Sequence, residues 1–150
     1  MNYLNKVSNV TVSQVIDLRS RILRPGQPLV NSQYEEDYDP TTFHLGSFNE
    51  SMKIVTVGTF IQQRHSYFFN SKLSYRLRGM ATEIEFQKKG YGKNLIIAAE
   101  KILIARSCDL LWFNARLSAL DFYKKLGFKI MGEVFELPSI GSHIVMFKNY

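Results

Sequence analysis

The chain has 150 residues, of which 45% are hydrophobic and 13% aromatic. This is enough for one well-filled core and too little for two ordinary domains, so we expect a single domain over residues 1–150. The one cysteine, Cys108, excludes an internal disulfide framework and suits a reducing cytoplasm. No apolar stretch is long enough to cross a bilayer, so we expect a soluble cytoplasmic protein with no membrane partner.

The formal net charge of +6 favours a polyanionic partner, which by charge alone is a nucleic acid, a membrane surface or a phosphorylated cofactor. Positive residues form small clusters at Arg19–Arg24, Arg76–Arg78 and Lys88–Lys93. The last two clusters flank a glycine-containing segment, which is the natural place for such an anion.

The first third of the chain predicts one helix between a strand and a long connection. Tyr3–Val7 indicates a short strand, and helical spacing of apolar residues predicts a helix over Thr11–Leu23, which Pro25-Gly26 ends. The polar, acidic residues 31–42 form a connection that is long for a compact domain. Such a connection is either functional or an unremarkable surface loop, and the sequence leaves both open.

The remaining elements alternate strands with helices. A turn at residues 49–51 joins two predicted strands into a hairpin, and Gly127 is placed to end the last helix in a left-handed conformation. The predicted strands are His44–Phe48, Lys53–Ile61, Ser74–Glu85, Asp109–Phe113, Phe128–Val134 and His143–Phe147, and the predicted helices are Leu95–Ala105 and Ser118–Leu126.

The segment Gln87–Lys93 predicts an anion site, because it is a glycine turn between a strand and a helix. Gly90 and Gly92 allow positive φ and a close approach of the backbone to a ligand. The first N–H groups of a helix lack intrahelical partners and lie at the positive end of its dipole, which suits a phosphate. Neither the P-loop pattern nor the dinucleotide G-x-G-x-x-G pattern is present.

Two motifs in this order resemble those of the GNAT N-acetyltransferases. Residues 78–81 and then 85–93 are similar to that family's Gln/Arg-x-x-Gly-x-Gly/Ala signature, which its pyrophosphate-binding helix follows. Downstream, Asn114-Ala115, Ala119, Phe122-Tyr123, Lys125 and Gly127-Phe128 resemble a second family segment. The chain departs from the family at Ile84 and Lys88, where proline and glycine are common.

The resemblance implies a mixed α/β (α+β) GNAT fold. Its central sheet is mixed, mostly antiparallel and six- to seven-stranded, with helices on both faces. A splayed parallel pair of strands, ending near Thr82 and Phe113, forms the acetyl-CoA cleft in that family.

The resemblance also implies an enzyme that moves an acetyl group from acetyl-CoA to a primary amine of a small molecule or peptide, by direct attack in a ternary complex. Acetyl-CoA (coenzyme A) is the co-substrate, and no metal is expected. The cofactor-binding residues implied are Met80, Ala81, Thr82, Gln87, Lys88, Lys89, Gly90, Tyr91, Gly92, Lys93, Asn114, Ala119, Phe122 and Lys125.

Two residues are the catalytic candidates. Tyr123 matches the family position whose phenol donates a proton or hydrogen bond to the thiolate leaving group. Glu83 is the candidate general base for the amine; Glu85, two residues on in the predicted strand, would share its face. His143 lies in a segment that resembles one subset of the family, but a hydrogen-bonded structural histidine is the expectation for it.

Two other functions stay open: a non-catalytic acyl-CoA sensor with the same cofactor site, and a basic nucleic-acid-binding module. We expect no nucleic-acid partner, whereas a homodimer is frequent in the family. Arg19, Arg24 and the acidic segment Glu35–Asp39 are placed to steer a charged acceptor, but solvated surface is the expectation for each.

Overall fold

The computed structural model describes residues 6–150, so most of the strand predicted over Tyr3–Val7 lies outside the described residues. The chain divides into two compact units, one of residues 1–61 and 77–103 and the other of residues 62–76 and 104–150. We call them the first and second units and describe each by itself. The single domain expected over residues 1–150 stays a prediction.

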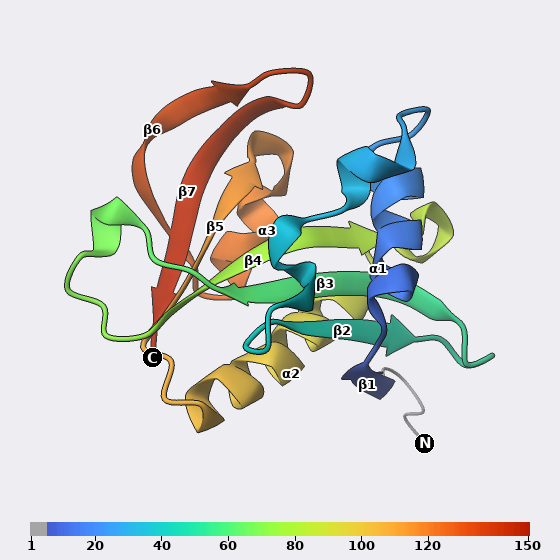
Figure 1. Ribbon diagram of the computed structural model, residues 1–150, viewed down its shortest axis with the longest axis horizontal. Helices are drawn as coiled ribbons and strands as arrows, with labels where there is room; N and C mark the ends of the chain where they lie inside the picture. The colour runs from blue at the N-terminus through green and yellow to red at the C-terminus, as the bar shows by residue number, and fades with distance from the viewer. Residues whose placement is uncertain (1–5) are drawn as a thin grey trace. The chain divides into compact units, whose positions relative to one another are not determined.

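The strands form a seven-stranded sheet in the order β1-β2-β3-β4-β5-β7-β6 (Figure 1). The pair β4–β5 is parallel and joins Ser74–Arg76 to Leu110–Trp112, whereas β1–β2, β2–β3, β5–β7 and β6–β7 are antiparallel. The predicted mixed, mostly antiparallel sheet is therefore confirmed. The strands are β1 (Lys6–Asn9), β2 (Phe43–Phe48), β3 (Ile54–Gln62), β4 (Ser74–Thr82), β5 (Leu110–Arg116), β6 (Lys129–Leu137) and β7 (Gly141–Asn149).

In the first unit, helix α1 (Val12–Leu18) packs on one face of the sheet. A capping box begins it: the Gln14 N–H donates to Thr11 Oγ1, and the Thr11 N–H donates to Gln14 Oε1 at 2.8 Å. Val15 and Leu18 are buried against Val57 and Ala81. The helix predicted over Thr11–Leu23 is confirmed in position, but its last five residues, Arg19–Leu23, form a π-helix.

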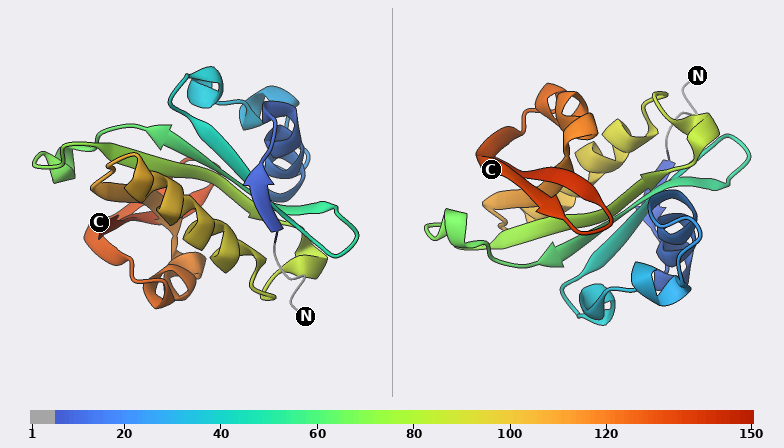
Figure 2. Two further views of the ribbon diagram at one scale, coloured as in Figure 1. Left: turned by 90° about the horizontal axis from the view of Figure 1, so that it is seen from below. Right: turned by 90° about the horizontal axis from the view of Figure 1, so that it is seen from above.

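Helix α2 (Tyr91–Ala105) covers the opposite face of the first unit. A Cβ added at Gly58 would lie 3.1 Å from Leu95 Cδ2, so this glycine lets the helix approach β3 closely. Successive strand residues point to opposite faces, and the neighbouring Val57 contacts α1. Helices therefore lie on both faces, as predicted (Figure 2).

The acidic connection after α1 folds into two short 3₁₀-helices, η2 (Leu29–Ser32) and η3 (Glu35–Tyr38). A buried ion pair fixes them. Arg19 donates two hydrogen bonds of 2.8 Å to the Asp37 carboxylate, and both side chains are 1% exposed. The expectation of solvated surface is therefore wrong for Arg19 and Asp37, because each neutralises the other inside the fold.

The second unit is built on β5 and the β6–β7 hairpin. Helix α3 (Leu120–Lys125), which follows a 3₁₀ turn η6 (Leu117–Ala119), ends at Gly127 with φ +97°, so the predicted left-handed cap is confirmed. On the other face of β5, the Trp112 indole N–H donates to the Gln63 carbonyl at 2.9 Å. Its ring meets His65 edge to face, with 4.7 Å between centroids.

Two expectations about the elements are corrected. Strand β4 ends at Thr82, and residues 84–86 form a 3₁₀-helix, η5 (Ile84–Phe86). Glu83 and Glu85 therefore do not share a strand face, since only β-structure alternates with a period of two.

Among residues 6–150, no helix is both long and apolar enough to cross a membrane.

Candidate functional site

The turn before α2 supplies an open, positively charged backbone cradle. Gly90 has φ +91°, and no atom lies within 4 Å of the position that a Cβ would take there. Lys88 also has a positive φ, of +61°, which a non-glycine residue adopts only at a cost. The GNAT family, which the chain resembles, commonly has glycine at this position, and glycine adopts a positive φ without that cost. Gly92 lies inside the helix and does not use a positive φ.

The first turn of α2 offers unpaired donors. The Asn94 N–H donates to the Gly90 carbonyl at 3.1 Å, and the N–H groups of residues 91–93 precede it with no intrahelical acceptor. Lys88, Lys89 and Lys93 are exposed around them. Unpaired N–H groups, the helix dipole and three ammonium groups together suit a pyrophosphate.

Two predicted cofactor residues have side chains that hold this turn in place. The Gln87 side-chain amide donates to the Thr82 carbonyl at 3.1 Å. The Tyr91 ring is buried edge to face against Phe86, and its carbonyl accepts from Ser47 Oγ at 3.0 Å. What these two residues offer to a ligand is therefore their backbone.

Strand β4 has a glycine in a left-handed conformation near its end. Gly79 has φ +63°, which an L-residue rarely adopts. Beyond it, Ala81 is buried against α1, whereas Thr82 Oγ1 lies 2.9 Å from Thr56 Oγ1. The Glu83 N–H donates to the Val55 carbonyl at 2.8 Å. Met80–Thr82 are thus held in extended form by the fold around them.

Glu83, the candidate base, forms an ion pair with Arg21. Its carboxylate accepts a short hydrogen bond from Arg21, which also donates to Asp17 Oδ2 at 3.0 Å. The Glu83 side chain is 11% exposed, compared with 47% for Arg21. Hydrogen bonds to Asp17 and then to Glu83 raise the pKa of Arg21 further above its ordinary value, so the guanidinium stays charged.

Tyr123, the candidate proton donor, lies in an aromatic cluster of the second unit. Its ring centroid is 4.3 Å from that of Phe113 and 5.9 Å from that of Phe128. Burial raises the pKa of the Tyr123 phenol well above its ordinary value, so it stays protonated at neutral pH. A protonated phenol suits a donor to a thiolate.

The other predicted residues of the second unit lie on β5, η6 and α3. Asn114 is partly buried on β5 opposite Val145 of β7. Ala119 ends η6, and Phe122 is 37% exposed on α3 near Lys125. The role of these four residues in holding the cofactor stays a prediction.

His143 and Cys108 lie in environments that are typical of structural residues. His143 Nδ1 pairs with the Gly141 carbonyl at 2.8 Å, as expected for a hydrogen-bonded histidine. Burial raises the pKa of the Cys108 thiol, which does not suit a nucleophile. No group of three or more His, Cys, Asp or Glu side chains within residues 6–150 is arranged to hold a metal ion.

Comparison with known proteins identifies the class to which this fold and these motifs belong. Residues 49–130 match the acetyltransferase (GNAT) domain family. A protein of Bacillus subtilis (strain 168), named Uncharacterized N-acetyltransferase YitI, is 37% identical over 143 residues, which are 95% of each chain. The chain belongs to the GNAT acetyltransferase family.

Solved structures of similar fold have low sequence identity to the chain. An aminoglycoside 6'-N-acetyltransferase complexed with coenzyme A has a TM-score of 0.75 at 16% identity, with 96% of both chains covered. A chain of the NatC complex bound to Gag peptide and CoA has a TM-score of 0.78 at 15% identity, with 98% of this chain and 99% of that chain covered. At these identities the likeness establishes the fold.

Proposed function

We propose that this protein transfers an acetyl group from acetyl-CoA to a primary amine of a small molecule or peptide. The observation that carries the proposal is the first turn of α2, where unpaired backbone N–H groups and Lys93 surround the open space at Gly90. An anionic pyrophosphate satisfies these donors together. Both of the similar solved structures described above contain coenzyme A.

The end of β4 is proposed to take the pantetheine part of the cofactor. Backbone groups of Met80–Thr82 pair with its amides as an added strand does. One of these N–H groups polarises the thioester carbonyl and stabilises the oxyanion that forms when an amine attacks.

The reaction proposed is one direct transfer. Glu83 accepts a proton from the acceptor ammonium, the amine nitrogen bonds to the acetyl carbon, and the carbon–sulfur bond breaks. Tyr123 donates its proton to the departing thiolate and regains one from water, while the nitrogen releases its second proton to water, so that a neutral amide and a free thiol form. The buried Cys108 does not suit an acetyl-enzyme intermediate, which supports attack in a ternary complex.

The test is calorimetric titration of acetyl-CoA into the native protein and two charge-reversal variants of α2. Lys93→Glu places an anion in the first turn, where it stabilises the helix by about 0.3–1 kcal/mol and repels the pyrophosphate. We expect an unchanged or higher melting temperature with at least about tenfold weaker binding. Lys101→Glu, farther along the same exposed helix surface, is the matched control and leaves the affinity unchanged.

Three outcomes separate the candidate functions. Binding that Lys93→Glu weakens, followed by acetylation in a panel of primary amines, supports the enzyme. Binding without turnover over the whole panel favours the acyl-CoA sensor. No binding by the native protein contradicts the proposal, and salt-sensitive binding to DNA or RNA is then the measurement to make.

A further inference from the structure

Arg78 lies on the face of β4 opposite α2, close to the proposed thioester position. Its neighbours Leu77 and Met80 face α2, since a Cβ at Gly58 would lie 3.4 Å from a side-chain atom of each. Arg78 instead reaches to the side of α1, where it stacks on Tyr34. Two residues of strand span about 7 Å, so Arg78 lies within reach of a small acceptor at Met80.

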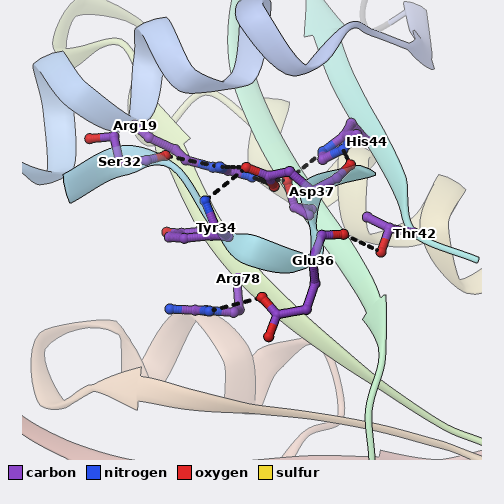
Figure 3. Close-up of polar contacts among 9 residues, drawn as sticks. Arg19, Ser32, Tyr34, Glu36, Asp37, Thr42, His44 and Arg78 are labelled. Atoms are coloured by element: carbon purple, nitrogen blue, oxygen red, sulfur yellow. Dashed lines mark hydrogen bonds and ion pairs between the residues drawn. The ribbon is translucent and has the colours of Figure 1, made fainter. Parts of the chain in front are cut away.

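Three side chains form a stack in this region (Figure 3). The Tyr34 ring lies between Arg19 and Arg78, and each guanidinium carbon is 3.9 Å from the ring centroid. Arg19 is neutralised by Asp37, to which the Tyr34 N–H also donates at 3.0 Å. The buried ion pair therefore fixes the ring, and the ring fixes the plane of Arg78.

The edge of Arg78 has spare hydrogen-bonding capacity. Its nearest acidic partner is Glu36, with 3.8 Å between Nη1 and Oε2, which is beyond hydrogen-bond length. Within residues 6–150, the structure gives Arg78 no other ion pair and no hydrogen bond. The Arg78 side chain is 31% exposed and that of Glu36 is 30% exposed, so a small molecule reaches both.

We infer that Arg78 recognises a carboxylate on the acceptor, so that the substrate class is a small primary amine that carries a carboxylate. The inference rests on the proposed function. A guanidinium forms two parallel hydrogen bonds with a carboxylate, and one whose plane is already fixed loses little freedom on binding. The Glu36 carboxylate marks the side of Arg78 from which an acceptor carboxylate approaches. When no acceptor is bound, Glu36 occupies the position beside the guanidinium that the acceptor carboxylate would take.

A simpler role for the pair is to attach the η3 segment to β4 by a surface ion pair. The two roles predict opposite effects of removing the Glu36 charge. If Glu36 competes with the acceptor, Glu36→Gln strengthens acceptor binding. If the pair only attaches the segment, Glu36→Gln and Arg78→Gln have the same effect.

The experiment measures kcat and KM for free amino acids and for the carboxamide of each, with saturating acetyl-CoA. For the native protein we expect the free acids to be preferred. Arg78→Gln raises KM for the acids on the order of 10- to 100-fold, because a charged hydrogen-bonding pair is lost. The same variant leaves KM for the carboxamides unchanged. Glu36→Gln lowers KM for the acids several-fold. The matched control is Arg64→Gln, the same change at an exposed arginine, and it alters neither series.

The inference is overturned if the native protein acetylates carboxamides as well as acids, or if Arg78→Gln changes both series equally. Circular dichroism melts of each variant check the fold. Acetyl-CoA binding, in which the proposed function gives the Arg78 side chain no part, is measured separately and distinguishes failure of this inference from failure of the proposed function. A native protein that binds acetyl-CoA and acetylates only uncharged amines refutes the carboxylate inference and leaves the proposed function standing, whereas absence of cofactor binding refutes both.

Discussion

Arg19 lies directly against Gly79. A Cβ at Gly79 would be 2.6 Å from Arg19 Nε and 3.1 Å from its Cδ. Because Arg19 is 1% exposed and ion-paired with Asp37, it has no free space into which to move. The left-handed conformation at Gly79 and the buried ion pair therefore depend on each other, and only glycine satisfies both the backbone conformation and the contact.

Gly79→Ala is expected to lower the free energy of unfolding by about 2–4 kcal/mol, since backbone strain and displacement of a buried charged side chain add together. Chemical denaturation measures the change. Gly26→Ala is the control for strain alone: φ there is +75° and no atom lies within 4 Å of the added Cβ. It should cost only about 1 kcal/mol. Equal losses in the two variants would refute the steric account.

Removing one partner of the buried pair should be strongly destabilising. Asp37→Ala leaves the Arg19 guanidinium buried without its anion, and we expect a loss of about 3–5 kcal/mol. The double variant Arg19→Met/Asp37→Leu should recover part of that loss, because no buried charge remains. A double variant no more stable than Asp37→Ala would contradict this explanation.

Asp37 also makes stability depend on pH. Burial alone raises its pKa, but hydrogen bonds from Arg19 and the Tyr34 N–H lower it below its ordinary value. A folded-state pKa below the unfolded value of about 3.9 means that this stabilisation is complete above pH 4 and is lost as pH falls through the folded-state pKa. Denaturation from pH 7 to pH 2 should show a smaller acid-induced loss in Asp37→Asn than in the native protein.

Glu83 has two separable roles, ion-pair partner and proposed base. Glu83→Gln should lower kcat by about 100-fold or more and change the pH–rate profile, as loss of a general base does. Arg21→Gln removes the same ion pair but keeps the carboxylate, so kcat should fall much less. If both variants lose the same activity, Glu83 is a structural partner and another group is the base.

Tyr123→Phe keeps the aromatic packing with Phe113 and removes only the hydroxyl. We expect kcat to fall about 10- to 100-fold, while KM for acetyl-CoA and the melting temperature change little, because a proton donor to the leaving group acts in the transition state. The decisive measurement is steady-state kinetics with a leaving group of lower pKa. With an acyl donor whose leaving group needs no protonation, Tyr123→Phe should recover most of the native rate.

Local sequence patterns were sufficient for much of the fold and of the candidate site. The glycine at 127 ends α3 with a positive φ, and the segment Gln87–Lys93 joins a strand to a helix with its first donors unpaired. These features depend on backbone conformation and on neighbours within one helical turn, which the sequence displays directly. The two motifs likewise identified the family that the comparisons confirm.

Tertiary structure alone decided which charges are buried and what they contact. Arg19 and Asp37 lie 18 residues apart, and Arg21 and Glu83 lie 62 apart, so neither pairing leaves a trace in local periodicity. The stack of Arg19, Tyr34 and Arg78 joins a π-helical turn, the residue that precedes the 3₁₀-helix η3, and a strand. Charged residues in a sequence are read as surface because isolated charges cost free energy to bury, and only the fold can bring together the partners that offset that cost.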